Sequence, residues 1–126
     1  MPENSTKPRA LVADDEHTIA DTLATILSMH GFQARPVYSG EEALELAPEF
    51  KPDMLITDVS MDPGLNGIET AIRIREILPS IKILLFSGVA TTANLLDKAR
   101  SEGHDFEILA KPIHPQELLA KIRGLR

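Results

Sequence analysis

The chain has 126 residues, a formal net charge of −6 and no cysteine. This length is enough for one domain with its own apolar core, and a chain without cysteine has no disulfide scaffold, thiolate metal site or thiol nucleophile. The negative charge argues against direct nucleic-acid binding. No apolar run approaches the roughly 20 residues of a membrane span. We therefore expect a cytoplasmic protein that binds neither nucleic acid nor a membrane.

Residues 1–8 are polar and show no periodicity, so we expect a disordered segment followed by one domain over residues 9–126. In that domain, short apolar runs alternate with segments of helical periodicity. We predict strands at residues 9–13, 33–38, 53–58, 81–86 and 106–110, and helices at 17–30, 39–48, 68–78, 91–102 and 115–125. Pro36 cannot donate to a strand ladder, which predicts that the second strand lies at a sheet edge.

This order of elements predicts the fold class. Five strands that alternate with five helices over short connections indicate an α/β fold in which right-handed crossovers join parallel strands. The strands are apolar without alternation, as in a parallel sheet that helices cover on both faces. We therefore expect a three-layer sandwich built on a five-stranded parallel sheet.

Polar side chains follow four of the five predicted strands: Asp14 and Asp15, then Asp58, Ser87 and Lys111. In an open parallel sheet, the carboxyl ends of the strands form the functional crevice. Three carboxylates there raise one another's pKa values unless a cation lies among them, and Mg²⁺ prefers such oxygen ligands. A phosphoryl group beside Mg²⁺ and Lys111 could accept a hydrogen bond from Ser87 and be attacked by Asp58.

Each of these features also has an ordinary structural explanation. Asp15 or Glu16 could cap a helix, Ser87 and Gly88 could form a turn, and Lys111 could be a solvated surface residue. Their coincidence at four strand ends favours the functional interpretation. The four histidines lack the spacing of metal ligands, and we interpret them as surface residues; they are His17, His30, His104 and His114.

Over Arg9 to Leu125 the sequence resembles the receiver domain of two-component response regulators. The matching segments are Leu-Val-Ala-Asp-Asp-Glu at 11–16, Leu-Ile-Thr-Asp-Val-Ser-Met at 55–61, Asn-Gly at 66–67, Phe-Ser-Gly at 86–88 and Ala-Lys-Pro at 110–112. The resemblance implies a flavodoxin-like sheet of strand order 2-1-3-4-5. That order places the second strand at an edge, as Pro36 predicts independently.

The resemblance implies that Asp58 is the phosphorylation site and accepts its phosphoryl group from a histidine kinase or a histidine phosphotransfer protein. Such a domain catalyses its own phosphorylation and slow dephosphorylation, and it does not turn over a substrate as most enzymes do. The family's Mg²⁺ ligands correspond to Asp15, Asp58 and the backbone carbonyl of Ser60, with Asp14 acting through water. We expect the signal to leave through a downstream protein partner, a separate output domain or a phosphorylation-dependent dimer.

By the same match, Ser87 and Lys111 hold the phosphoryl oxygens, Gly88 leaves the access path open, and the bond between Lys111 and Pro112 is cis. Ser87 would also be part of the switch that responds to phosphorylation.

The sequence departs from the family at two places. Asp62 is inserted between Met61 and Pro63, which lengthens the loop after the phosphoacceptor. Ile108 stands where the family commonly has a switch aromatic, and Phe106 lies two residues earlier, so both belong to the predicted switch.

Three other functions share part of this pattern. A degenerate receiver would act only as a protein-binding module and would bind no Mg²⁺. A nucleotide or flavin binder would need a glycine- or hydroxyl-rich loop after the first strand, where this chain has Asp14, Asp15 and Glu16. A phosphatase with an aspartate nucleophile would need a second aspartate two residues downstream, and that position is Ser60.

Overall fold

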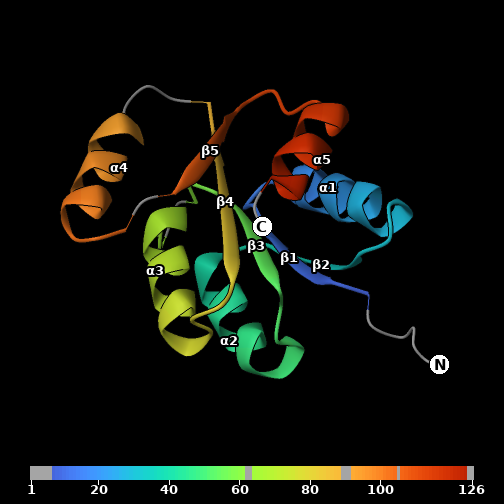
Figure 1. The fold of residues 1–126 in the computed structure, drawn as a ribbon, viewed down its shortest axis with the longest axis horizontal. Helices are drawn as coiled ribbons and strands as arrows, with labels where there is room; N and C mark the ends of the chain where they lie inside the picture. The colour runs from blue at the N-terminus through green and yellow to red at the C-terminus, as the bar shows by residue number, and fades with distance from the viewer. Residues whose placement is uncertain (1–6, 62–63, 89–91, 105, 125–126) are drawn as a thin grey trace.

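The structure, a computed structural model, describes residues 7–61, 64–88, 92–104 and 106–124. In these ranges five strands and five helices alternate along the chain, as the sequence predicts (Figure 1). The strands are β1 (Arg9–Ala13), β2 (Gln33–Val37), β3 (Met54–Asp58), β4 (Lys82–Ser87) and β5 (Glu107–Ala110), and the helices are α1 (His17–Met29), α2 (Gly40–Phe50), α3 (Gly67–Ile77), α4 (Thr92–Ser101) and α5 (Pro115–Arg123). Most of the segment predicted to be disordered lies outside the described residues.

The strands form one parallel sheet of order β2-β1-β3-β4-β5, which confirms the predicted flavodoxin-like topology. β2 lies at an edge, as its proline predicts. The chain passes from β1 outward to β2 and then back across β1 to β3. This reversal opens a crevice at the carboxyl ends of β1 and β3, where ligands of such sheets bind.

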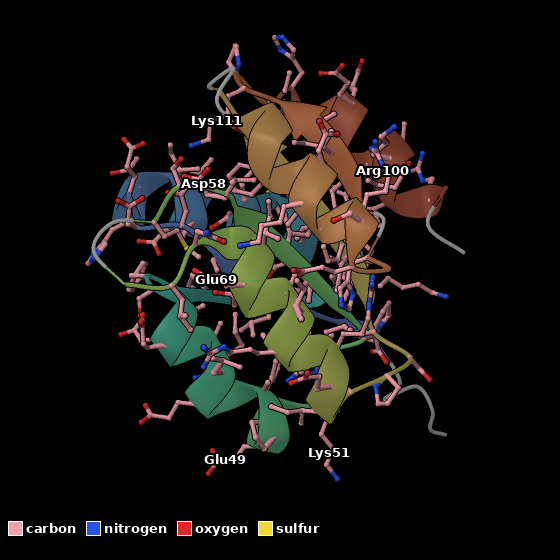
Figure 2. The ribbon with its side chains drawn as sticks, turned by 90° about the vertical axis from the view of Figure 1, so that its left-hand side faces the viewer. Glu49, Lys51, Asp58, Glu69, Arg100 and Lys111 are labelled. Carbon is pink, nitrogen blue, oxygen red and sulfur yellow. The ribbon has the colours of Figure 1, made fainter. Side chains whose placement is uncertain are left out.

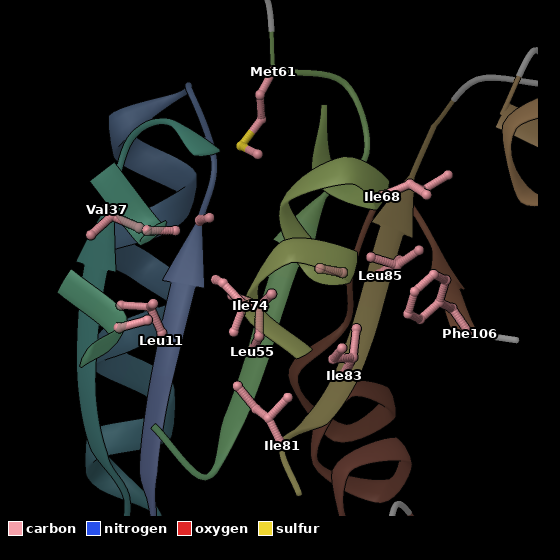
Figure 3. Close-up of a cluster of buried hydrophobic side chains, with 14 of the residues drawn as sticks. Leu11, Val37, Leu55, Met61, Ile68, Ile74, Ile81, Ile83, Leu85 and Phe106 are labelled. Atoms are coloured by element: carbon pink, nitrogen blue, oxygen red, sulfur yellow. The ribbon is translucent and has the colours of Figure 1, made fainter. Parts of the chain in front are cut away.

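Alternate strand residues point to opposite faces of the sheet and pack against different helices (Figure 1). Leu11, Leu55 and Leu85 belong to a cluster with buried residues of α2 and α3 (Figure 3). Val12 and Ile56 belong to a second cluster with buried residues of α1 and α5. Both faces of the sheet are therefore covered, which explains why the strands are apolar without alternation.

The helix boundaries agree with the predicted ones to within two residues, and the end of α2 is the informative difference. We predicted that this helix ends near Pro48, but it continues to Phe50 because Phe50 is buried in the core and its carbonyl accepts a 2.9 Å hydrogen bond from Arg9 Nη1. Lys51 ends the helix in the left-handed conformation. Among the helices of the described residues, none combines the length and apolar character needed to cross a membrane.

Candidate functional site

The register of the sheet brings the predicted site residues together. Asp58 pairs with Phe86 across β3 and β4, and Ser87 pairs with Ala110 across β4 and β5. The backbone N–H of Lys111 then donates to the Ser87 carbonyl at 3.0 Å. The predicted nucleophile, hydroxyl and lysine thus leave adjacent strands at the same edge. The peptide bond that follows Lys111 is cis, as the resemblance implies.

The three predicted carboxylates form one cluster. Asp14, Asp15 and Asp58 each contribute an oxygen, and these oxygens lie within 4.8 Å of one another. Asp14 is fully buried and Asp58 is almost so, whereas Asp15 is exposed. The Asp14 side chain also accepts a 2.9 Å hydrogen bond from the Glu16 N–H, which orders the start of α1 beside the cluster.

Lys111 supplies the positive charge of the site (Figure 2). Its Nζ donates to Asp58 Oδ2 at 3.1 Å and lies 3.6 Å from Asp14 Oδ2. The ammonium group also lies 5.3 Å from the centre of the buried Phe86 ring, a position in which the face of the ring favours a cation. Lys111 is therefore held between the two buried carboxylates.

Burial controls the acidities of these groups. Burial raises the pKa of Asp14 from 3.8 to about 6. The hydrogen bond from Glu16 lowers this pKa, and the negative charge of Asp58 raises it further. Burial also raises the pKa of Asp58, although the hydrogen bond and charge of Lys111 act in the opposite direction. Burial alone would lower the pKa of Lys111, but the hydrogen bond and charge of Asp58 and the charge of Asp14 raise it, so the lysine stays protonated.

The donor set fits a hard divalent cation such as Mg²⁺. Asp14 Oδ2 is buried and accepts no hydrogen bond from the described residues. The Lys111 Nζ lies 3.6 Å away, beyond hydrogen-bond distance, so the lone pairs of this oxygen remain available to a metal cation. Three carboxylates and one ammonium leave a charge of −2 on the cluster. One divalent cation bound by carboxylate oxygens would neutralise that charge.

Asp14→Asn is expected to stabilise the metal-free protein at pH 7. Because the pKa of Asp14 is raised on folding, its contribution to the free energy of unfolding falls as the pH rises from about 4 to about 6 and is constant above that range. The variant should be more stable by about 1–3 kcal/mol at pH 7 and nearly unchanged at pH 4. Urea unfolding in the presence of a chelator measures this difference; a gap that does not widen with pH would contradict it.

The chain after Asp58 lies close to the carboxylates. The Ser60 N–H lies 3.4 Å from Asp58 Oδ1, and the Gly67 N–H donates to the Val59 carbonyl at 2.8 Å. A Cβ atom on Gly67 would overlap the Asp58 carbonyl oxygen, so the first turn of α3 can approach only with glycine there. The inserted Asp62 lies outside the described residues.

The predicted switch residues lie at the end of β4, on β5 and just before β5. Ser87 is buried, and Phe106 is buried just before β5. The Arg75 guanidinium lies 4.8 Å from the centre of the Phe106 ring, and His104 stacks on that ring at 6.1 Å. Ile108 is 37% exposed. The aromatic side chain is thus packed inward in this structure, while the position closer to the site carries an exposed aliphatic side chain.

The interpretation of all four histidines as surface residues is wrong for one of them. His17, His30 and His114 are exposed. His104 is half-buried, because α4 ends beside it and its ring packs on Phe106. In the sequence, Phe106 is only an apolar residue two positions after His104, and this spacing does not indicate that the two rings stack.

Two contacts next to the site were not predicted. The Glu41 carboxylate in the first turn of α2 accepts a 3.0 Å hydrogen bond from the Leu65 N–H. The Thr57 hydroxyl lies 3.8 Å from the buried sulfur of Met61. Glu41 was visible only as an acidic residue at a helix start, and no periodicity relates it to a residue in a later loop.

An apolar groove of about 630 Å³ adjoins the site between α1 and the segment after β5. Its apolar walls include Ile19 and Ile26 of α1 and Ile113. Gly88 and Lys111 also line it, so the groove reaches the lysine that binds Asp58.

Comparisons with known proteins agree with this geometry. The family model of the response regulator receiver domain matches residues 10–123. Response regulator MprA of Mycobacterium ulcerans is 32% identical over 117 residues, which are 93% of this chain and 49% of MprA. DNA-binding response regulator MtrA of Mycobacterium tuberculosis is 29% identical over 118 residues, 94% of this chain and 50% of MtrA. The chain spans about half the length of these curated relatives.

Solved structures show the same similarity. A response regulator receiver domain protein from Clostridium thermocellum has a TM-score of 0.81 and 31% sequence identity, with 94% of this chain and 93% of that chain covered. The Vibrio cholerae chemotaxis protein CheY4, at 24% identity and a TM-score of 0.84, shares the fold over 96% of this chain and 100% of its own. With its parallel sheet, its acidic pocket of Asp14, Asp15 and Asp58 and a family match over nearly its whole length, the chain belongs to the response regulator receiver domain family.

Proposed function

We propose that this domain accepts a phosphoryl group on Asp58 in the presence of Mg²⁺ and thereby switches a protein-interaction surface. The observation that carries the proposal is the meeting of three carboxylates within 4.8 Å with a lysine 3.1 Å from one of them. A buried Asp14 oxygen that accepts no hydrogen bond from the described part of the chain and lies 3.6 Å from Lys111 Nζ also supports a cation site here.

The proposed reaction is a phosphoryl transfer to a carboxylate. An oxygen of Asp58 attacks phosphorus, the bond between phosphorus and the donor breaks, and the leaving group takes the bonding electrons. The leaving group is the imidazole of a phosphohistidine, which takes up a proton, or acetate when acetyl phosphate is the donor. Lys111, already beside Asp58, stabilises the charge that develops on the phosphoryl oxygens.

Other residues are assigned roles by their positions. Asp14, Asp15, Asp58 and the Ser60 carbonyl would hold Mg²⁺, which neutralises charge on the phosphoryl group when bound. Their support is the clustering of the carboxylates and the 3.4 Å approach of the Ser60 N–H to Asp58. Ser87, at the end of the strand between Asp58 and Lys111, would donate its hydroxyl to a phosphoryl oxygen.

The partner that donates the phosphoryl group is proposed to be a histidine kinase or a histidine phosphotransfer protein. Such a partner must bring a histidine ring to Asp58 and therefore has to cover the surface around it. The groove between α1 and Ile113 offers apolar contact area directly beside Lys111. Burial of that area would contribute to binding of the donor protein.

Incubation with Mg²⁺ and acetyl phosphate is expected to add one phosphoryl group per chain, and a chelator should prevent it. Intact-mass spectrometry measures the addition, and calorimetric titration measures Mg²⁺ binding. A degenerate receiver that only binds proteins would show neither Mg²⁺ binding nor phosphorylation, and that result would overturn the proposal.

A further inference from the structure

The loop between β3 and α3 is fastened to α2 by one carboxylate. Glu41 Oε2 accepts a hydrogen bond of 3.0 Å from the backbone N–H of Leu65, 24 residues later in the chain. α2 is itself fixed to the sheet through its buried residues Ala43, Ala47 and Phe50. This bond, which we call the Glu41 tether, connects a firmly packed helix to the loop that follows Asp58.

The Glu41 carboxylate lies close to the backbone of Gly64 and Leu65. Gly64 has φ +109°, and a Cβ atom added there would lie 2.7 Å from Glu41 Oε2. A Cβ atom on Gly40, the residue before Glu41, would overlap Thr70 Oγ1 of α3 and would lie 3.0 Å from the Leu65 Cβ. The left-handed backbone conformation at residue 64 favours glycine, and the missing Cβ atom at residue 40 leaves room for Thr70 and Leu65 beside α2.

The other end of the loop is fixed independently. The Val59 N–H donates to the Phe86 carbonyl at 3.0 Å, and Met61 is buried with its sulfur 3.8 Å from the Thr57 hydroxyl. Figure 3 shows the Met61 side chain directed toward the core cluster. The loop is thus held at Met61 by the core and at Leu65 by the tether.

We infer that Glu41 is a positioning residue for the metal site. Leu65 lies two residues before Gly67, whose N–H donates to the carbonyl of Val59, the residue before Ser60, at 2.8 Å. By holding Leu65, the tether restricts the start of α3 and, through this hydrogen bond, the Ser60 backbone beside Asp58, so that less conformational freedom is lost when Mg²⁺ binds. The inference rests on the proposed function, since Mg²⁺ is the ligand concerned. Glu41 takes part in the tether only as a hydrogen-bond acceptor. The side-chain oxygen of a glutamine at position 41 should therefore accept the same hydrogen bond and preserve the tether.

Mg²⁺ titration of four variants tests the inference. Glu41→Ala should weaken Mg²⁺ binding about tenfold, as loss of an outer contact of a metal site commonly does, whereas Glu41→Gln should stay within about twofold of the unmodified protein. Glu45 lies one turn later on α2 and is exposed, so Glu45→Ala and Glu45→Gln are the matched controls for loss of charge and should change nothing. Equal losses in Glu41→Ala and Glu41→Gln would show an effect of charge alone and overturn the inference.

Phosphorylation kinetics separate positioning from general damage. With acetyl phosphate as donor, Glu41→Ala should be several-fold slower at low Mg²⁺ and regain about the normal rate at saturating Mg²⁺. A misfolded variant would be slow at both concentrations. Slow phosphorylation of folded Glu41→Ala at saturating Mg²⁺ would contradict a role limited to positioning.

Amide hydrogen exchange of the metal-free protein tests the tether without the reaction. Leu65 should exchange about tenfold faster in Glu41→Ala than in the unmodified protein or in Glu41→Gln, and unchanged exchange would overturn the inference. If the unmodified protein bound no Mg²⁺, the proposed function would fail and the link to the metal with it. The exchange result would then still decide whether Glu41 holds the loop.

Discussion

Asp58→Asn is expected to reduce phosphorylation by acetyl phosphate below detection. The variant keeps the size of the side chain but replaces a carboxylate nucleophile with an amide, which does not form the acyl phosphate. The variant should also be at least as stable as the unmodified protein, because it removes one of three clustered carboxylates, and burial of Asp58 raises the pKa of its own carboxyl group. Intact-mass spectrometry and urea unfolding measure the two effects.

Asp53→Asn is the matched control for this variant. Asp53 lies just before the other end of the same strand, where its side chain accepts a 2.8 Å hydrogen bond from the Arg9 N–H. The substitution should leave phosphorylation unchanged, since it lies away from the carboxyl end of the sheet. Phosphorylation that persists in Asp58→Asn would refute the assignment of the nucleophile.

Lys111→Ala is expected to slow phosphorylation about 100-fold, because the variant lacks the ammonium group that stabilises the developing phosphoryl charge. It should also destabilise the metal-free protein at pH 7 by about 1–3 kcal/mol, since Asp14 and Asp58 then lose the ammonium group that lies 3.6 Å and 3.1 Å from their carboxylates. Mg²⁺ should recover part of the lost stability, because it binds the same carboxylates.

Lys121→Ala is the control for the lysine variant. Lys121 Nζ lies 3.5 Å from Glu107 Oε1, and the two side chains are 40% and 57% exposed. An exposed pair of this kind contributes about 1 kcal/mol or less, so the control should show little change in stability and normal phosphorylation. A Lys111→Ala variant that behaved like this control would contradict the role given to Lys111.

The arrangement of the site was predictable because it follows from strand ends. Once the apolar runs that precede Asp58, Ser87 and Lys111 are assigned to parallel strands, the sheet itself brings these residues to one edge. No contact between side chains had to be known. The edge position of β2 was predictable for a similar reason, because the backbone of Pro36 excludes a central strand.

The contacts that depend on packing between helices and loops were not predictable. The Glu41 tether joins a helix start to a loop on a different element, and the contact of Arg75 with Phe106 joins α3 to the segment before β5. Such pairs have no characteristic spacing in the sequence. The continuation of α2 past Pro48 has the same origin, because burial of Phe50 outweighs the local preference of proline to end a helix.

The central claim is that Asp58 itself carries the phosphoryl group, and locating the modification tests it most directly. After reaction with acetyl phosphate and Mg²⁺, borohydride reduction converts an acyl phosphate into an alcohol that peptide mass spectrometry can assign to one residue. We predict the reduced side chain at position 58 alone. A reduced side chain at Asp14 or Asp15, or phosphate bound to a histidine with position 58 unmodified, would contradict this account.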